Sequence, residues 1–506
     1  MTARLPAHGH EMTARRLGVF AQDEALVFMR RDCAICRSEG LAPRTRVLLK
    51  TGSSEAIATL IQVDDHIVEQ EEAGLSEAAW TQLKAKEGET LSVRHAPDLA
   101  FAGALRRRIF GHRLATADFS GLIGEVAAGR LSEIQLAAFL TACSTLPLDD
   151  HETLGLTRAM VEVGERLSWP QALVLDKHSI GGLPGNRTTP IVVAIVAAHG
   201  LTIPKTSSRA ITSPAGTADT METLTRVDLS LDEIRKVVEH EHGCLAWGGA
   251  VNLSPADDVL IRVERALDID PEGQLIASVL SKKIAAGATH AVIDMPVGRT
   301  AKVRDEETAA RLMDRLARIA RTLGLEAHVV VSDGSQPVGR GIGPALEARD
   351  VLAVLQNQAD APADLREKAV MLAAALLELG GAAPQGAGPV LAEAAIADGR
   401  AWRKFQAICE AQGGLREPPH ASHHKPLLAG AAGMVADIDN RRLGRLAKLA
   451  GAPDAKAAGV EMHVRLGDQV GARQPLLTVH AESAGELDYA MAYAAANPDL
   501  IAVRAA

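Results

Sequence analysis

A short apolar strand that runs straight into a glycine-rich loop constrains the fold of this chain more than any other feature. Ala172–Asp176 is typical of a buried strand, and the loop Ser179–Asn186, with the sequence Ser-Ile-Gly-Gly-Leu-Pro-Gly-Asn, follows it. Thr189–His199 is typical of a buried helix that ends at Gly200, and Leu201–Thr206 of a second strand. A strand, a loop, a helix and a second strand in this order predict an α/β unit with a parallel sheet.

The regions on either side have different patterns. The first 97 residues contain short β-branched segments separated by turn residues, which predicts a β-rich accessory domain. Farther along, four apolar residues recur on one helical face after the N-cap Ser132, and they are Leu136, Phe139, Leu140 and Cys143. Near the end, Val460–Leu466 alternates as in a half-barrel of the biotinyl/lipoyl type, but the lysine of that type is missing from the hairpin tip, so we expect a structural role.

Length and charge restrict the class of protein. A chain of 506 residues is expected to form three or four domains. The net charge of −9 argues against broad nucleic-acid binding, which needs a basic surface. No apolar run reaches 18 residues and the N-terminus has no signal-peptide pattern, so we expect a cytoplasmic protein without contact to membranes.

The cysteines do not predict a metal site. Five are present, an odd number without the spacing of a disulfide framework. Cys33 and Cys36 form a C-x-x-C pair, but a structural zinc site needs two further ligands and no second pair exists. We therefore predict no bound metal, and the role of this pair stays open.

The first glycine loop has residue types that suit an anion. Asp176, Lys177, His178 and Ser179 stand where the strand turns into the loop, and open α/β sheets bind ligands at this edge. The glycines let backbone N–H groups approach an anion closely, and the following helix adds its positive end. The loop matches neither the P-loop nor the dinucleotide fingerprint, so an ordinary glycine turn is the alternative to a phosphate site.

A second polar run follows the next strand. Thr206–Thr217 has the sequence Thr-Ser-Ser-Arg-Ala-Ile-Thr-Ser-Pro-Ala-Gly-Thr, which gathers hydroxyl groups and one guanidinium on a flexible backbone. Because neighbouring parallel strands end at one edge of a sheet, we expect the two loops to face one crevice and to hold an oxyanion together. A solvated loop is the alternative.

Both runs resemble one family. Ser207–Glu222, with Ser, Arg, Gly-Thr, Asp and Glu in this order, resembles the motif of the thymidine/pyrimidine-nucleoside phosphorylases, and Lys177–Gly182 resembles their phosphate loop. The similarity extends from about residue 100 to the end. The added N-terminal part resembles the long subgroup of the family, which includes the AMP phosphorylases. The resemblance implies an α/β fold in which a helical domain and a mixed-sheet α/β domain form a cleft.

On this basis we expect four domains. They are a β-rich N-terminal accessory domain (1–97), a helical domain (98–167 and 252–288), an α/β phosphate-binding domain (168–251 and 289–425) and an α+β C-terminal domain (426–506). As in the family, the apolar helical faces would supply a contact for a homodimer or a larger homo-oligomer.

The resemblance also implies roles for single residues. The phosphate would be contacted by Lys177, Ser179, Ser207 and Thr217. Positions that hold the nucleotide in AMP phosphorylases are matched by Gly182, Ser208, Arg209, Ala210, Ile211, Thr212, Ser213, Thr217, Ser278 and Lys302. The base-contacting set of the thymidine phosphorylases is matched by His178, Arg262, Ser278 and Lys282. Asp270 matches a proton donor, so the catalytic set comprises Lys177, His178 and Asp270.

These residue types fit phosphorolysis of a nucleoside or a nucleoside 5′-monophosphate. Inorganic phosphate would attack C1′ of the sugar, and the base would leave with a negative charge that hydrogen bonding or protonation stabilises. Asp270 can donate a proton only if its surroundings raise its pKa, and an acidic helix cap is the alternative role for it. The reaction needs no metal and no organic cofactor.

One departure from the family bears on the substrate. Nucleoside-cleaving members have Gly-Val-Gly-Asp after the paired glycines, whereas this chain has Leu183-Pro-Gly-Asn-Arg187. An amide in place of an acid, with a cation beside it, favours a substrate with a 5′-phosphate. The base and the sugar stay open. A strict pyrimidine-nucleoside phosphorylase, a non-catalytic nucleotide-binding protein and a magnesium-dependent enzyme like anthranilate phosphoribosyltransferase are the alternatives.

Overall fold

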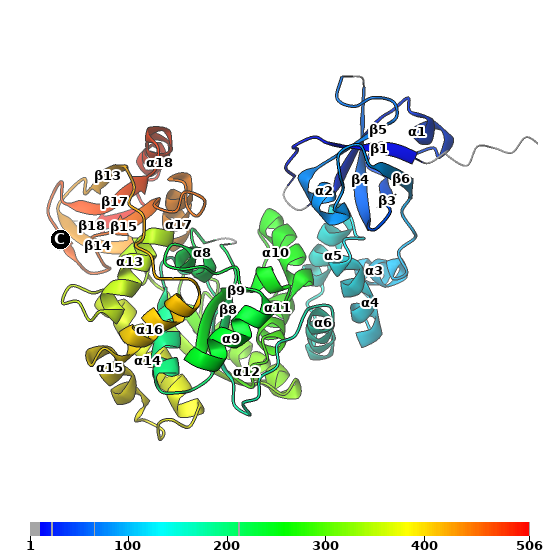
Figure 1. Ribbon diagram of the computed structural model, residues 1–506. Coiled ribbons are helices and arrows are strands. Elements are labelled where there is room, and N and C mark those ends of the chain that lie inside the picture. Colours follow the sequence, from blue (N-terminus) through cyan, green and yellow to red (C-terminus); the bar gives the residue numbers. More distant parts are fainter. Residues whose placement is uncertain (1–10, 22–23, 65, 211–212, 505–506) are drawn as a thin grey trace, which may run out of the picture. The chain divides into compact units, whose positions relative to one another are not determined.

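The protein consists of two compact units. The computed structural model describes residues 11–21, 24–64, 66–210 and 213–504 (Figure 1). The first unit comprises Met1–Leu146 and the second Pro147–Ala506. In the described residues no helix is both long and apolar enough to cross a membrane.

A closed β-barrel forms most of the first unit. Its strands are β1 (Glu11–Arg16), β2 (Leu26–Arg30), β3 (Arg46–Lys50), β4 (Glu55–Val63), β5 (Glu72–Leu75) and β6 (Thr90–His95), and the neighbours run β1-β5-β2-β4-β3-β6 before β6 returns to β1. The helices are α1 (Ala34–Ser38), α2 (Glu77–Leu83), α3 (Ala102–Ile109), α4 (Thr116–Ala127) and α5 (Glu133–Thr145). Alternate strand residues such as Val27 and Met29 point into the barrel and are fully buried. The β-rich start of the chain is confirmed.

Helix α5 has the predicted apolar face. Ser132 caps it, with its side chain accepting from the backbone N–H of Gln135, and Gln135 completes a capping box. The four apolar residues of the predicted face, including Cys143, are buried.

Cys33 and Cys36 are buried in the core of the barrel unit. Cys33 caps α1, and its Sγ accepts a hydrogen bond from the backbone N–H of Cys36 at 3.3 Å. Both thiols are free. Across the described part of the chain, no three His, Cys, Asp or Glu side chains are grouped so that they could hold a metal ion.

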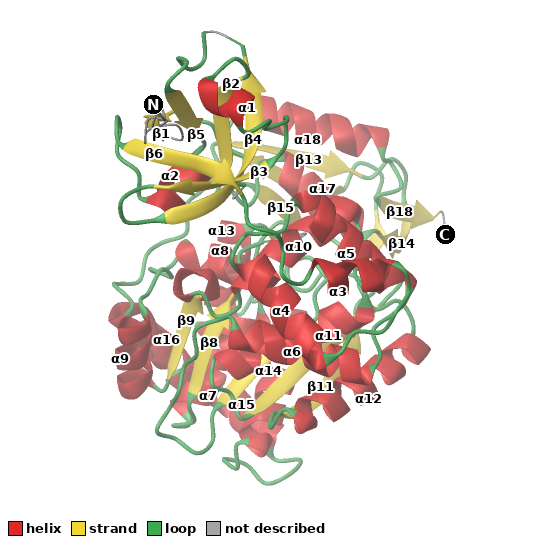
Figure 2. Ribbon diagram, turned by 90° about the vertical axis from the view of Figure 1, so that its right-hand side faces the viewer, coloured by secondary structure: helices red, strands yellow, loops and turns green. Residues whose placement is uncertain are grey.

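The second unit is built on parallel strands, which form two sheets, so the two strands predicted on either side of the first loop and its helix do not pair in one sheet. β10 (His290–Val297) lies between β7 (Leu175–Ser179) and β11 (Glu326–Asp333), and it runs parallel to both. β8 (Ile203–Ser207) pairs in parallel with β9 (Gly243–Trp247). Figure 2 shows helices on both sides of these strands. The α/β fold class is thereby confirmed.

The helices of this unit cover the strands and contribute most of its core. They are α6 (Asp150–Glu162), α7 (Thr188–Ala198), α8 (Thr217–Glu222), α9 (Leu231–Glu241), α10 (Pro255–Leu267), α11 (Glu272–Ala285), α12 (Glu306–Thr322), α13 (Pro344–Leu355), α14 (Ala363–Leu379), α15 (Gly388–Ala397) and α16 (Arg400–Ala411). Every residue of α7 from Thr188 to Ala197 is buried, so this helix forms the centre of the largest apolar cluster. Ser230 and Glu233 form a capping box at the start of α9.

The strand before the first loop differs from its predicted position. β7 begins at Leu175 rather than at Ala172 and continues through Ser179, because Lys177, His178 and Ser179 pair with Val292–Asp294 of β10. The polar residues therefore belong to the strand itself. The backbone that carries these side chains is fixed by strand pairing and is not part of a flexible turn.

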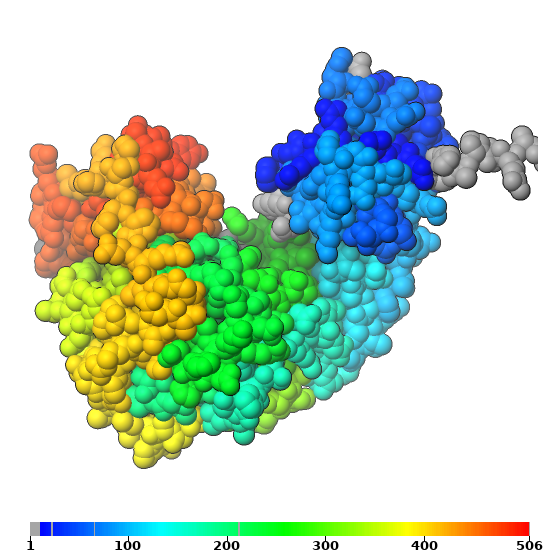
Figure 3. All heavy atoms as spheres, in the orientation of Figure 1, coloured from blue at the N-terminus to red at the C-terminus, as the bar shows by residue number. Residues whose placement is uncertain are grey.

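The C-terminal residues form two small sheets with helices, which gather at one end of the second unit (Figure 3). One sheet has the order β12 (Gly341–Ile342), β15 (Gly459–Met462), β17 (Pro475–Ala481) and β13 (His423–Leu428). The other has the order β16 (Gln469–Val470), β14 (Gly433–Ile438) and β18 (Ile501–Arg504). α17 (Asn440–Leu449) and α18 (Ala484–Ala496) complete this part, which has the predicted α+β character.

Candidate active site

Lys177 is the middle residue of β7 and is almost completely buried. Only 1% of its surface is exposed, and its Nζ donates to Thr188 Oγ1 at 2.8 Å and to Thr189 Oγ1 at 3.3 Å. Both threonines begin α7, whose first backbone N–H groups carry partial positive charge. Burial lowers the pKa of Lys177 to about 8. The arrangement places one ammonium group and a helix N-terminus beside the first loop.

A buried carboxylate orients Ser179. Its hydroxyl donates to Asp294 Oδ2 at 2.8 Å and accepts from Asn186 Nδ2 at 3.3 Å. Asp294 also accepts from Ser332 Oγ at 2.6 Å and lies 3.3 Å from Lys368 Nζ. Asp294 was not predicted as a site residue, although an acid inside the apolar run of β10 is visible in the sequence.

The glycines of the first loop allow close contacts with other segments. Gly182 has φ +82°, and a Cβ atom there would lie 2.4 Å from the backbone nitrogen of Lys302. Gly185 has φ +66°, and a Cβ atom would lie 2.3 Å from the carbonyl oxygen of Val338. Only glycine fits these positions, and Gly182 brings Lys302 next to the loop.

Asp219 fixes the backbone of the second loop. Its Oδ2 accepts from the N–H groups of Ala210 at 2.6 Å and of Gly216 at 2.8 Å. At the start of the loop, Ser207 Oγ is buried and has no hydrogen-bond partner among the described residues. A buried hydroxyl without a partner is costly unless a ligand meets it.

Arg187 joins the two loops. It donates to Thr217 Oγ1 at 2.8 Å and to the carbonyl of Ala215 at 2.9 Å. Its Nε also donates to Glu347 Oε2 at 2.6 Å, and both side chains are mostly buried. Thr220 donates to the same carboxylate oxygen at 3.2 Å. The expectation that the loops face one crevice is consistent with these contacts, since the end of one loop is bonded to the end of the other.

Helices α10 and α11 contribute a third set of predicted site residues. Lys282 lies 2.5 Å from Asp257 Oδ2, and its Nζ donates to Ser278 Oγ at 3.4 Å. Burial and the neighbouring lysines, of which Lys283 has the largest effect, lower the pKa of His178 well below its usual value. His178 is therefore neutral at pH 7 and can donate or accept a hydrogen bond without carrying charge.

Asp270, the predicted proton donor, pairs with a cation at the surface. Its carboxylate is 40% exposed and forms a 2.7 Å ion pair with Lys302 Nζ. The carboxyl group of Glu264 lies close to Asp270. Burial, together with the charges of Asp257 and Asp270, raises the pKa of Glu264 to about 8. Glu264 was not predicted as a site residue, because nothing in its local sequence indicates that it is partly buried.

The remaining selected residues are distributed around these groups. Ser208, Arg209 and Ser213 belong to the second loop, and Arg262 lies half-buried on α10. Ile211 and Thr212 lie outside the described residues.

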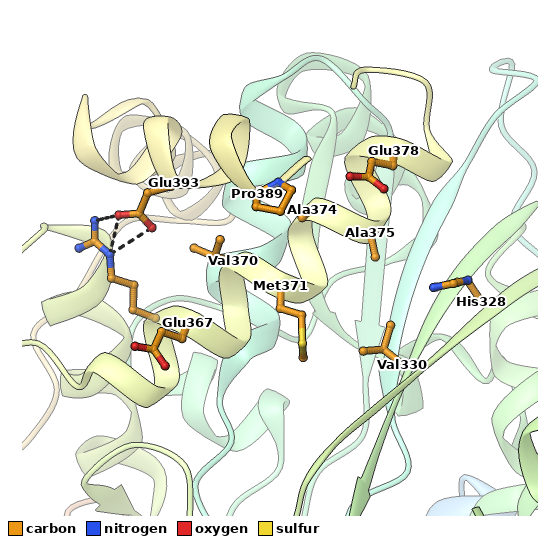
Figure 4. Close-up of a pocket in the computed structure, with 11 residues that line it drawn as sticks. His328, Val330, Glu367, Val370, Met371, Ala374, Ala375, Glu378, Pro389 and Glu393 are labelled. Carbon is orange, nitrogen blue, oxygen red and sulfur yellow. Dashed lines mark hydrogen bonds and ion pairs between the residues drawn. The ribbon is translucent and has the colours of Figure 1, made fainter. Parts of the chain in front are cut away.

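A separate cavity of about 670 Å³ lies against the face of β11 (Figure 4). His328 and Val330 of β11, with Met371 of α14, line one part, and Pro389 and Glu393 of α15 line another. None of the selected site residues lines this cavity, so we do not assign the active site to it.

Comparisons with known proteins agree with this architecture. The glycosyl transferase family, a/b domain, matches residues 171–402, and the helical bundle domain of the same family matches residues 102–164. The pyrimidine nucleoside phosphorylase C-terminal domain matches residues 434–500. The anthranilate phosphoribosyltransferase of Thermus thermophilus has a similar fold with a TM-score of 0.51 and 20% identity, over 61% of this chain and 99% of that chain. The class of protein is thus a glycosyltransferase.

Full-length relatives define the family more narrowly. A protein of Chelativorans sp. (strain BNC1) named "Putative thymidine phosphorylase" is 60% identical over 509 residues, which covers all of both chains. One of the same name from Tolumonas auensis is 58% identical over 97% of this chain and 98% of its own. The chain belongs to the family of these thymidine phosphorylase-like proteins.

Proposed function

We propose that this protein catalyses phosphorolysis of the N-glycosidic bond of a nucleoside or nucleoside 5′-monophosphate. The products are the free base and a (deoxy)ribose 1-phosphate, or ribose 1,5-bisphosphate from a nucleotide. The observation that carries the proposal is the contact between the two loops, in which Arg187 at the start of α7 donates to Thr217. Beside this contact lie the buried ammonium group of Lys177 and the Ser207 hydroxyl, which has no hydrogen-bond partner among the described residues. The names of the full-length relatives support the same reaction.

In this mechanism the phosphate binds against both loops. Lys177 and the N-terminus of α7 supply positive charge, and Ser179, Ser207 and Thr217 supply hydroxyl groups. Phosphate held beside C1′ attacks as the bond to the base breaks, and the sugar gains oxocarbenium character. The phosphate group is a co-substrate, and the chemistry requires no metal or organic cofactor.

The departing base lies on the side of α11 in this proposal. Lys282 and Ser278 face the same region as neutral His178, so they can donate hydrogen bonds to the negative charge that develops on the base. Asp270 acts as proton donor only if substrate binding separates it from Lys302. We further place the enzyme in the cytoplasm as a homodimer or larger homo-oligomer.

Lys302 is the cation that supports a nucleotide substrate. The charge of Arg187, which the sequence analysis assigned to this purpose, is already met by Glu347. Lys302 is 30% exposed, touches the first loop at Gly182 and is bonded to the surface carboxylate of Asp270. A 5′-phosphate could replace that carboxylate as its partner.

A substrate panel tests the proposed function. Thymidine, uridine, AMP, CMP and UMP are incubated with and without phosphate, and released base is measured by chromatography in the absence of magnesium. We expect release only with phosphate. If no base is released from any compound, the chain is a binding protein, and release only with a diphosphate-activated sugar and magnesium would point to a phosphoribosyltransferase.

Replacing Lys302 tests the nucleotide preference. We expect Lys302→Met to lower kcat/KM for AMP, relative to kcat/KM for thymidine, about 10- to 100-fold, the loss expected for one charge-assisted hydrogen bond. Lys236, an exposed residue of α9, provides the control variant Lys236→Met, which leaves the ratio unchanged. An unchanged ratio in Lys302→Met means that the 5′-group is not read by this residue.

The pH dependence tests the role of Lys177. Because its pKa is about 8, the ammonium form prevails below pH 8 and is lost as the pH rises above it. We expect kcat/KM for phosphate, which reports the free enzyme, to fall about tenfold for each pH unit above this value. A profile that stays flat to about pH 9.5 would show that phosphate binding does not depend on this charge.

A further inference from the structure

A chain of ion pairs leads away from the second loop. Asp219, which holds the backbone of the loop, lies 3.5 Å from Arg209 Nη1. Arg209 in turn forms two hydrogen bonds with Glu222, from Nη1 to Oε2 at 2.8 Å and from Nη2 to Oε1 at 2.7 Å. Its guanidinium also lies over the ring of Trp247, 4.6 Å from the ring centroid. These contacts fix Arg209 against α8 and β9.

The C-terminal part of the chain contributes the last charged residue of this series of ion pairs, Lys456. Lys456, in the segment between α17 and β15, places its Nζ 2.7 Å from Glu222 Oε2 and 3.9 Å from Asp219 Oδ1. The backbone carbonyl of Lys456 accepts a hydrogen bond from the N–H of Ala345, at the start of α13, at 3.0 Å. The position of Lys456 is therefore set by backbone contacts as well as by its ion pairs.

A second contact joins the same two regions. A Cβ atom at Gly444 of α17 would lie 3.6 Å from Pro214 Cδ of the second loop, so the helix backbone packs against that proline. The loop thus has the C-terminal part of the chain on one side and α8 on the other. The charged groups Lys456, Glu222, Arg209 and Asp219 bridge the two.

We propose that Lys456 is a positioning residue for catalysis, which holds the Ser207–Thr217 loop in its phosphate-binding conformation through Glu222, Arg209 and Asp219. This inference rests on the proposed function, because that loop carries Ser207 and Thr217. The C-terminal part of the chain then serves the active site without touching the substrate. Loss of the lysine charge leaves Glu222 to Arg209 alone and weakens the hold on the loop.

The test compares two lysine-to-methionine variants. Lys456→Met removes the contact to Glu222, and Lys404→Met removes a matched ion pair between α16 and α9, in which Lys404 Nζ lies 2.8 Å from Glu241 Oε2. Both pairs are partly exposed to a similar extent. We expect Lys456→Met to raise the KM for phosphate about tenfold with kcat changed less than about threefold, and Lys404→Met to change neither. Lys456→Arg should restore the KM.

Hydrogen exchange separates this proposal from the proposed function. The backbone N–H groups of Ala210 and Gly216 are bonded to Asp219. In Lys456→Met, the peptide covering the loop should exchange about tenfold faster than in wild type and in Lys404→Met. Unchanged exchange and an unchanged KM overturn the proposal. If the wild type shows no phosphorolysis, the proposed function fails, while the exchange rates still decide whether Lys456 holds the loop.

Discussion

The variant Lys177→Met is expected to lower kcat/KM for phosphorolysis about 10³-fold, the size of effect seen when a preorganised electrostatic group is removed from an active site. Lys177 is buried within β7, and its Nζ donates to the two threonines that begin α7. Methionine fills the space of the lysine stem but brings no charge to the phosphate. Steady-state rates at saturating nucleoside and varied phosphate measure the loss.

Lys368 supplies the matched control. Lys368 is also a buried lysine, and its Nζ lies 3.3 Å from Asp294 Oδ2. It lies on α14 rather than beside either loop. Lys368→Met should reduce stability while lowering kcat/KM less than about tenfold. If Lys177→Met retains more than about a tenth of the wild-type kcat/KM, the phosphate is held elsewhere and the assignment of the first loop is wrong.

The two polar loops could be predicted, because both signals are local. A strand followed by glycines (172–186) and a strand followed by hydroxyl residues (201–217) are each contiguous in the sequence. The two strands lie in different sheets, and Arg187 rather than a common sheet joins the loops. The apolar face of α5 and its N-cap Ser132 were equally local. In each case neighbouring residues in the sequence determine the structure.

The partners of the charged residues could not be predicted. Arg187 was expected to offer its charge to a substrate, but Glu347, 160 residues farther along the chain, accepts that charge. Asp294 lies 115 residues from Ser179, whose hydroxyl donates to it. No periodicity or spacing relates such positions, since packing of α13 and β10 against the loops creates the pairs. The chemistry of the site therefore depended on contacts that only the fold reveals.

Asp176→Asn should cause the largest loss of stability. Asp176 Oδ2 lies 2.6 Å from Lys283 Nζ and its Oδ1 lies 3.8 Å from Lys205 Nζ, and all three side chains are buried. An amide leaves both ammonium groups buried without a negative charge between them. We expect the free energy of unfolding of the second unit to fall by about 3–5 kcal/mol at pH 7. Asp150→Asn is the control, because Asp150 also pairs with two cations, Arg315 and Arg318, but its side chain is 46% exposed. Removing the charge of Asp150 should lower the free energy of unfolding by about 0–1 kcal/mol.

The pH dependence of the loss in Asp176→Asn identifies its cause. Burial lowers the pKa of Lys205 to about 7, below the ordinary lysine value of about 10.5, so between these values the unfolded chain binds more protons and a rising pH favours the folded state. Asp176 raises the pKa of Lys205, so without Asp176 Lys205 folds in the uncharged form, which costs less as the pH approaches about 10.5. The destabilisation should therefore be smaller at about pH 9 than at about pH 6. Urea unfolding measures it through tryptophan fluorescence, because Trp169, Trp247 and Trp402 all lie in the second unit. An equal loss at both pH values would mean that lost packing or hydrogen bonding, and not buried charge, makes Asp176 important to the fold.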